Sequence, residues 1–87
     1  MSGAVNRVVV DIFGSQYNLK GEEPKEHLER LASLVDNKMR DISSRNPRLN
    51  ISQTAILAAL NIADEFFKLR KEYNSLEELL QESNDDE

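Results

Sequence analysis

The sequence predicts an α+β fold, in which an N-terminal β-hairpin and one helix form a small head and a long C-terminal helix forms a coiled coil. Two observations carry this prediction. In the strand expected at 7–13, Val8, Val10 and Ile12 point one way and Val9, Asp11 and Phe13 the other, and Tyr17 and Leu19 alternate with polar residues after the turn. In the second half of the chain, apolar residues recur at alternating spacings of four and three. That average of about 3.5 is the period of a helix that supercoils around a partner.

The hairpin is expected to have strands on either side of a turn at Gly14-Ser15. Val8, Val10 and Ile12 point to one face of the first strand, because successive side chains alternate in direction. A Gly-X connection suits a type II′ turn, since glycine tolerates a positive φ at the first turn position. A lone hairpin is marginal in water, so a helix, the strands of another chain, or both must cover it.

A first helix is expected after the break at Gly21, with Pro24 at its first helical position and glutamates nearby that complement the helix dipole. Pro47 ends this helix, and residues 43–46 form its exit. Its apolar face repeats at helical spacing and consists of Leu28, Leu31, Ala32, Val35, Met39 and Ile42.

The second helix is expected to begin at a cap, either Asn50 or Ser52, and to run to about Glu82. At 1.5 Å per residue it is a rod of about 45 Å, longer than a compact chain of this size is wide, so it must protrude. One apolar stripe along it is the predicted oligomerisation seam: Ala59, Ile62, Phe66, Leu69, Tyr73, Leu76 and Leu80.

The long helix changes character at Phe67. Up to that point a second apolar stripe runs beside the seam, formed by Ile56, Leu60, Ala63 and Phe67, and predicts burial between the hairpin and the first helix. Beyond it only the seam continues. The chain therefore divides into a head at 1–67, a protruding coiled coil at 68–82 and a disordered acidic tail at 83–87.

The protruding part of the seam is too apolar for a monomer. Burying its large side chains is worth about 8–15 kcal/mol before entropy is subtracted, which is comparable to the whole stability of a small domain. The sequence therefore predicts an obligate oligomer. In a parallel pair Glu72 would lie near Glu77 of the partner chain, which disfavours that arrangement and leaves antiparallel and four-helix assemblies open.

The composition of the chain argues against several classes of function. The chain has 87 residues, a formal net charge of −5 and no cysteine, so we expect neither a disulfide nor a thiolate metal site, and a nucleic-acid partner is disfavoured. His27 is the only histidine, and no nucleophile–base spacing or phosphate-binding glycine loop is present. The sequence predicts no catalytic residue, metal, cofactor or small-molecule substrate. With no membrane span or signal peptide recognisable, we expect a cytoplasmic protein.

Three segments resemble one family in order. Ile56-Leu-Ala-Ala-Leu-Asn-Ile-Ala-Asp-Glu65 resembles the signature of the ZapA family of bacterial cell-division proteins, and its Leu-Ala-Ala-Leu-Asn run is the specific part. Val8-Val-Val-Asp-Ile-Phe-Gly-Ser-Gln-Tyr17 resembles the opening hairpin of that family, and Leu31-Ala-Ser-Leu-Val-Asp-Asn-Lys-Met39 resembles its first helix. The resemblance covers about residues 6–80.

The resemblance implies a function at the mid-cell division site. The family binds FtsZ, the bacterial tubulin homologue, and cross-links its filaments into bundles that stabilise the division ring. Members form homodimers through the head and homotetramers through the coiled coil, with heads at both ends. The alternative is a generic cytoplasmic coiled-coil adaptor with a different client, which an FtsZ pelleting experiment would distinguish.

Two polar groups are candidate partner-binding residues, each with a second interpretation. The first is basic and lies at the end of the first helix and in the loop after it: Lys38, Arg40, Arg45 and Arg48. It either docks an acidic partner or complements the negative C-terminus of the helix. The second lies on the long helix: Asn61, Asp64 and Glu65. It either binds a partner or satisfies neighbouring groups of the same chain.

Overall fold

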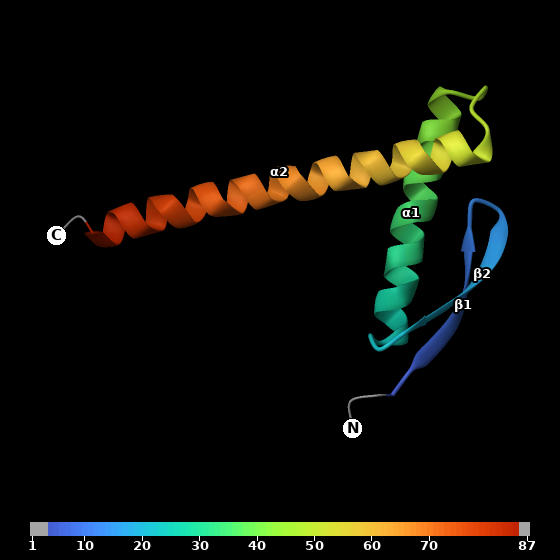
Figure 1. Ribbon diagram of the computed structural model, residues 1–87, viewed down its shortest axis with the longest axis horizontal. Helices are drawn as coiled ribbons and strands as arrows, with labels where there is room; N and C mark the ends of the chain where they lie inside the picture. Colours follow the sequence, from blue (N-terminus) through green and yellow to red (C-terminus); the bar gives the residue numbers. More distant parts are fainter. Residues whose placement is uncertain (1–3, 86–87) are drawn as a thin grey trace.

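Two strands and two helices follow one another along the chain (Figure 1): β1 (Asn6–Ile12), β2 (Ser15–Gly21), α1 (Lys25–Arg45) and α2 (Ile51–Asp85). The computed structural model describes the backbone of residues 4–85 and the side chains of 4–81. The molecule is extended, with a radius of gyration of 18.2 Å, where a compact chain of this length would have about 12 Å. The predicted fold class is confirmed.

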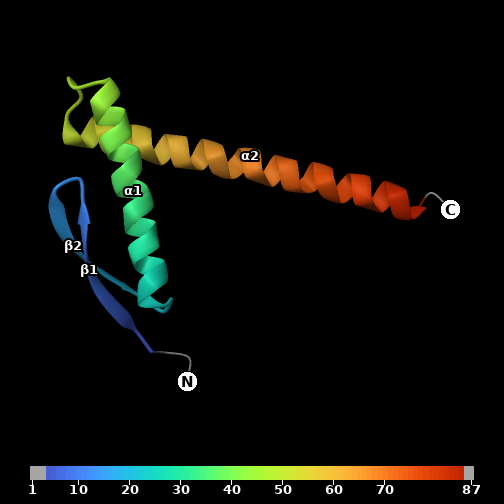
Figure 2. The ribbon, with the colours of Figure 1, turned by 180° about the vertical axis from the view of Figure 1, so that it is seen from behind.

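The long helix causes this extended shape. α2 has 35 residues, about 52 Å at the rise of an α-helix. The hairpin lies on one side of α1 and α2 projects on the other, as the views from the front and from behind both show (Figures 1 and 2). A rod therefore leaves the head on the side opposite the hairpin.

The hairpin turn lies at Phe13-Gly14, so the prediction of a turn at Gly14-Ser15 was wrong. Phe13 has φ 52° and Gly14 has φ 85°, and two positive values are those of a type I′ turn rather than type II′. A left-handed conformation costs a bulky residue about 1–2 kcal/mol. Phe13 keeps it because its N–H donates to Asp36 Oδ1 at 2.7 Å and its side chain packs against the core.

The antiparallel strands pair so that Val10 lies opposite Tyr17 and Ile12 opposite Ser15. The alternation predicted for β1 is confirmed, since Val10 is buried whereas Val9 remains 61% exposed. α1 packs on the inner face of β1. At the open end of the hairpin, Asn6 Nδ2 donates to the carbonyl of Glu23 at 2.6 Å, which ties β1 to the loop before α1.

Helix α1 begins one residue later than expected. Pro24 is its N-cap, and the Pro24 carbonyl accepts the N–H groups of His27 and Leu28 at 3.0 and 3.1 Å. The helix continues through residues 43–45, where the sequence predicts the exit, and ends at Arg45 with Asn46 as its C-cap, because the residue before a proline avoids the α conformation. Four residues of the predicted apolar face are buried: Leu28, Ala32, Met39 and Ile42.

The start of α2 confirms one of the two caps considered, Asn50. Its Oδ1 accepts the Gln53 N–H at 2.7 Å, and Gln53 Oε1 accepts the Asn50 N–H at 3.1 Å, so each residue satisfies a free backbone donor of the other, as in a capping box. One turn later, the Thr54 hydroxyl donates to the Asn50 carbonyl at 2.8 Å. Thr54 is fully buried, and this hydrogen bond satisfies its hydroxyl within the first turn of α2.

Helix α2 packs against α1 around Ala58, which is 1% exposed and joins Met39 and Ile42 in the core cluster. The expected burial of the second stripe is wrong for a single chain, since Ile56, Leu60 and Phe67 are exposed. A straight helix that crosses another touches it over a short length, so its other faces stay open. The helix also extends to Asp85, three residues into the predicted tail, while 86–87 lie outside the described residues.

Candidate interaction surfaces

The predicted oligomerisation seam is an apolar stripe open to solvent along α2. Within one chain only Ile62 is half-buried, where α2 leaves α1, and Ala59 is exposed. The large side chains beyond it are all more than half exposed: Phe66, Leu69, Tyr73, Leu76 and Leu80. An exposed apolar stripe of this length, on the part of α2 that projects beyond its crossing with α1, is a surface for another helix.

The seam continues into an apolar hollow beside the helix crossing. This hollow has a volume of about 460 Å³ and lies between α1 and α2. Four alanines and three larger residues line it: Ala55, Ala58, Ala59 and Ala63, with Val35, Ile62 and Phe66. Small side chains let another helix approach closely, because the knobs of the incoming helix fill the space that the alanines leave. Seam and hollow therefore form one continuous surface.

A second apolar groove lies between the hairpin and the start of α2. It has a volume of about 380 Å³. Tyr17 and Leu19 line its β2 side, and Ile51 and Ala55 line its α2 side. Because α1 covers β1, this side of β2 remains open within the chain. The sequence-based expectation that the hairpin needs further cover therefore holds for β2.

The basic group does not gather into one free patch. Arg40 Nε contacts both carboxylate oxygens of Asp36 at 3.1 and 3.0 Å, and Arg45 pairs with Asp41 at 3.4 Å. Both pairs join residues four apart on α1 and lie at the surface, where such pairs contribute little stability. Arg48 is exposed in the loop before α2 and has no ion pair among the described residues.

The structure brings together one residue from each predicted polar group. Lys38 of α1 forms an ion pair with Glu65 of α2, which links the two helices just beyond their crossing. The neighbouring Asp64 instead pairs along its own helix with Lys68 at 2.9 Å, and this hydrogen bond raises the pKa of Lys68. Asn61 is exposed. Within this chain, Lys38, Asp64 and Glu65 therefore each lie in an ion pair.

Asp36 is a residue whose role the sequence did not reveal. Its carboxylate accepts the Phe13 N–H and the Arg40 guanidinium together, and these two interactions, the backbone one first, lower its pKa below the ordinary value. The hydrogen bond from the Phe13 N–H to Asp36 joins the hairpin turn to α1 and offsets the cost of the positive φ at Phe13. The sequence feature that could have pointed to this role is the presence of an aspartate directly after Val35, beside the apolar face of the first helix.

The described residues carry no cluster of three or more histidine, cysteine or acidic side chains that would hold a metal ion. No helix in that part of the chain is long and apolar enough to cross a membrane.

The hairpin, the crossed helices and the open seam define a small α+β protein with a projecting coiled-coil-type helix. The family model described as cell division protein ZapA matches residues 8–86. The chain is 46% identical over 80 residues to a cell division protein ZapA from Geobacillus sp. (strain WCH70), covering 92% of each protein. It is 40% identical to one from Bacillus pumilus (strain SAFR-032), over 92% of this chain and 94% of that protein.

A solved structure agrees with these relatives. A ZapA mutant dimer from Geobacillus stearothermophilus matches with a TM-score of 0.69 and 38% identity, over 90% of this chain and 91% of that one. The chain belongs to the ZapA family of cell-division proteins.

Proposed function

We propose that this protein binds FtsZ and cross-links its filaments as a non-enzymatic oligomer, and that it acts in the cytoplasm at the mid-cell division site. The observation that carries the proposal is the open seam on a rod that projects from the head. Membership of a cell-division family supports the cellular role, and the dimeric relative supports self-association.

The mechanism we propose is avidity. Seam residues buried against a second chain hold two rods together, and rods joined in antiparallel orientation place their heads at opposite ends. A head that binds one filament weakly then raises the local concentration of the other heads for a neighbouring filament, and linked weak contacts bind far more tightly than single ones. Bundling therefore requires both a working head and an intact seam.

Pelleting and light scattering with purified FtsZ polymerised by GTP test the proposal. The wild-type chain should sediment with the filaments and increase scattering. Leu69→Asp/Leu76→Asp on the seam should reduce scattering to the level of FtsZ alone while some binding persists. Asn74→Asp/Ser75→Asp is the matched control, because it adds the same charge on the opposite face of the rod. A wild-type chain that neither sediments with the filaments nor bundles them would refute the function.

A further inference from the structure

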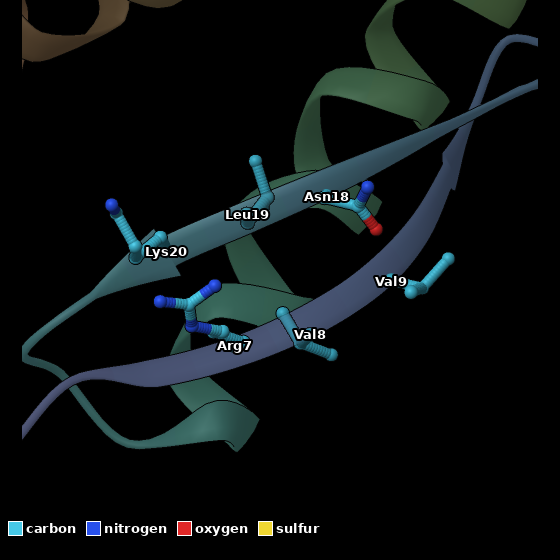
Figure 3. A pocket seen from close by; sticks show the side chains of 6 residues that line it. All are labelled: Arg7, Val8, Val9, Asn18, Leu19 and Lys20. Atoms are coloured by element: carbon cyan, nitrogen blue, oxygen red, sulfur yellow. The ribbon is translucent and has the colours of Figure 1, made fainter.

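The outer face of the hairpin carries two cations directly opposite each other. The strand register pairs Arg7 of β1 with Lys20 of β2, and Val9 with Asn18 in the next outward pair. Figure 3 shows Arg7 and Lys20 at the same end of the hairpin, with α1 behind the strands. All four residues are exposed. They therefore face solvent on the side of the sheet away from the helix.

Like charges opposite each other destabilise a strand pair. Four other cations, Lys38, Arg40, Arg45 and Lys68, each pair with a carboxylate. Arg7 and Lys20 have no carboxylate partner among the described residues. An anion placed between them would remove the repulsion and gain two charge-assisted hydrogen bonds.

The same face has room and apolar surface for more than an ion. A hollow of about 470 Å³ lies at this end of the hairpin, lined by Arg7, Val9, Asn18 and Lys20 of the outer face together with Val8 and Leu19. Val9 is 61% exposed beside the cations, and the Asn18 amide offers both a donor and an acceptor. Asp11 occupies the next outward position toward the turn. The charge therefore changes sign along the face, from basic at the open end to acidic near the turn.

We propose that this outer hairpin face docks an extended acidic segment of a protein partner, and the proposal rests on the function proposed above by assigning the face to the FtsZ filament. One carboxylate lies between Arg7 and Lys20. An apolar side chain two residues along lies over Val9, since outward positions on a strand repeat about every 7 Å. Asp11 repels a second carboxylate beyond it and so sets the direction of the segment.

The protein partner is favoured over a nucleic acid. Two cations offer only two phosphate contacts, while non-specific nucleic-acid binding comes from many. The net charge of −5 and Asp11 on the same face both repel a polyanion. The position of the face also suits a filament, because α2 projects on the opposite side of α1 (Figures 1 and 2). A partner held there does not meet the rod of the same chain.

The test uses the full chain and neutral substitutions that keep the hairpin intact. Arg7→Gln/Lys20→Gln should weaken sedimentation with FtsZ filaments by about tenfold in apparent Kd. Lys25→Gln/Arg30→Gln is the matched control: it removes the same charge from exposed α1 positions and should change the Kd by less than about twofold. Circular dichroism melts and sedimentation mass should match those of the wild type for both variants.

A second probe separates this inference from the function itself. A synthetic peptide alternating glutamate and valine, titrated to millimolar concentration, should shift the amide NMR signals of Arg7, Val9, Asn18 and Lys20 in the wild type, and not in the variant. If wild-type chain does not sediment with FtsZ, the proposed function fails and these shifts alone decide whether the face binds acidic segments. Equal sedimentation of wild type and Arg7→Gln/Lys20→Gln would overturn the inference while the function stands. A changed oligomeric mass of that variant would also overturn it, with a second copy of the chain as the occupant.

Discussion

The seam variant Leu69→Asp/Leu76→Asp should dissociate the oligomer. Leu69 is 64% and Leu76 57% exposed in one chain. Full burial of a leucine side chain is worth about 1.5–3 kcal/mol, so association can still gain about 1–2 kcal/mol from each. Two chains contribute four leucines, which amounts to about 4–7 kcal/mol. At 1.4 kcal/mol per factor of ten, the self-association constant should fall by about 10³-fold or more.

Sedimentation velocity across a concentration series measures this loss. Wild-type chain should sediment as an oligomer over the micromolar range, and the seam variant as a lighter species. Asn74→Asp/Ser75→Asp should keep the wild-type mass, because these positions lie on the opposite face of α2 and carry the same added charge. If the seam variant keeps the wild-type mass, or if the control dissociates equally, the assignment of the seam is refuted.

Three further changes test other parts of the chain. Asn50→Ala should lower the free energy of unfolding by about 1 kcal/mol through loss of the α2 cap, whereas Ser52→Ala should leave the urea midpoint nearly unchanged; equal losses would contradict the cap assignment. The lowered pKa of Asp36 means that its stabilisation is present above the ordinary carboxyl pKa and is lost as pH falls through the folded value. The acid unfolding curve below about pH 4 should therefore be less steep in Asp36→Asn, and an unchanged slope would exclude this carboxylate. Arg45→Glu/Arg48→Glu should weaken FtsZ co-sedimentation without changing oligomer mass; undiminished binding at physiological salt would remove both residues from the interface.

The elements of the fold were predictable because each depends on local chemistry. Strand alternation identified β1, since burial of Val10 and exposure of Val9 follow from the pleat. Asn50 and Ser52 were the two caps that the sequence offered for α2, and Asn50 fills this role because its side chain satisfies a backbone donor only three residues away. The period of the seam identified an open stripe on the rod.

The candidate site was predictable only in part. Seam residues such as Leu69 and Leu76 are open as expected, but the basic group is dispersed into ion pairs. Lys38 meets Glu65 across 27 positions of sequence, a contact that exists only because α2 crosses α1 near Ala58. No local pattern reports such a pairing, since the crossing depends on packing between helices.

The sequence by itself determined the hairpin, the helices and the period of the seam, because propensity, capping and hydrophobic spacing act over a few residues. Tertiary structure decided the strand register. A turn at Gly14-Ser15 would have set Arg7 opposite Glu22, whereas the turn at Phe13-Gly14 sets it opposite Lys20. That turn requires a phenylalanine with positive φ, which is unfavourable locally and is held by a carboxylate on another element. The charge of the outer hairpin face thus depends on a contact that forms only once α1 packs on β1.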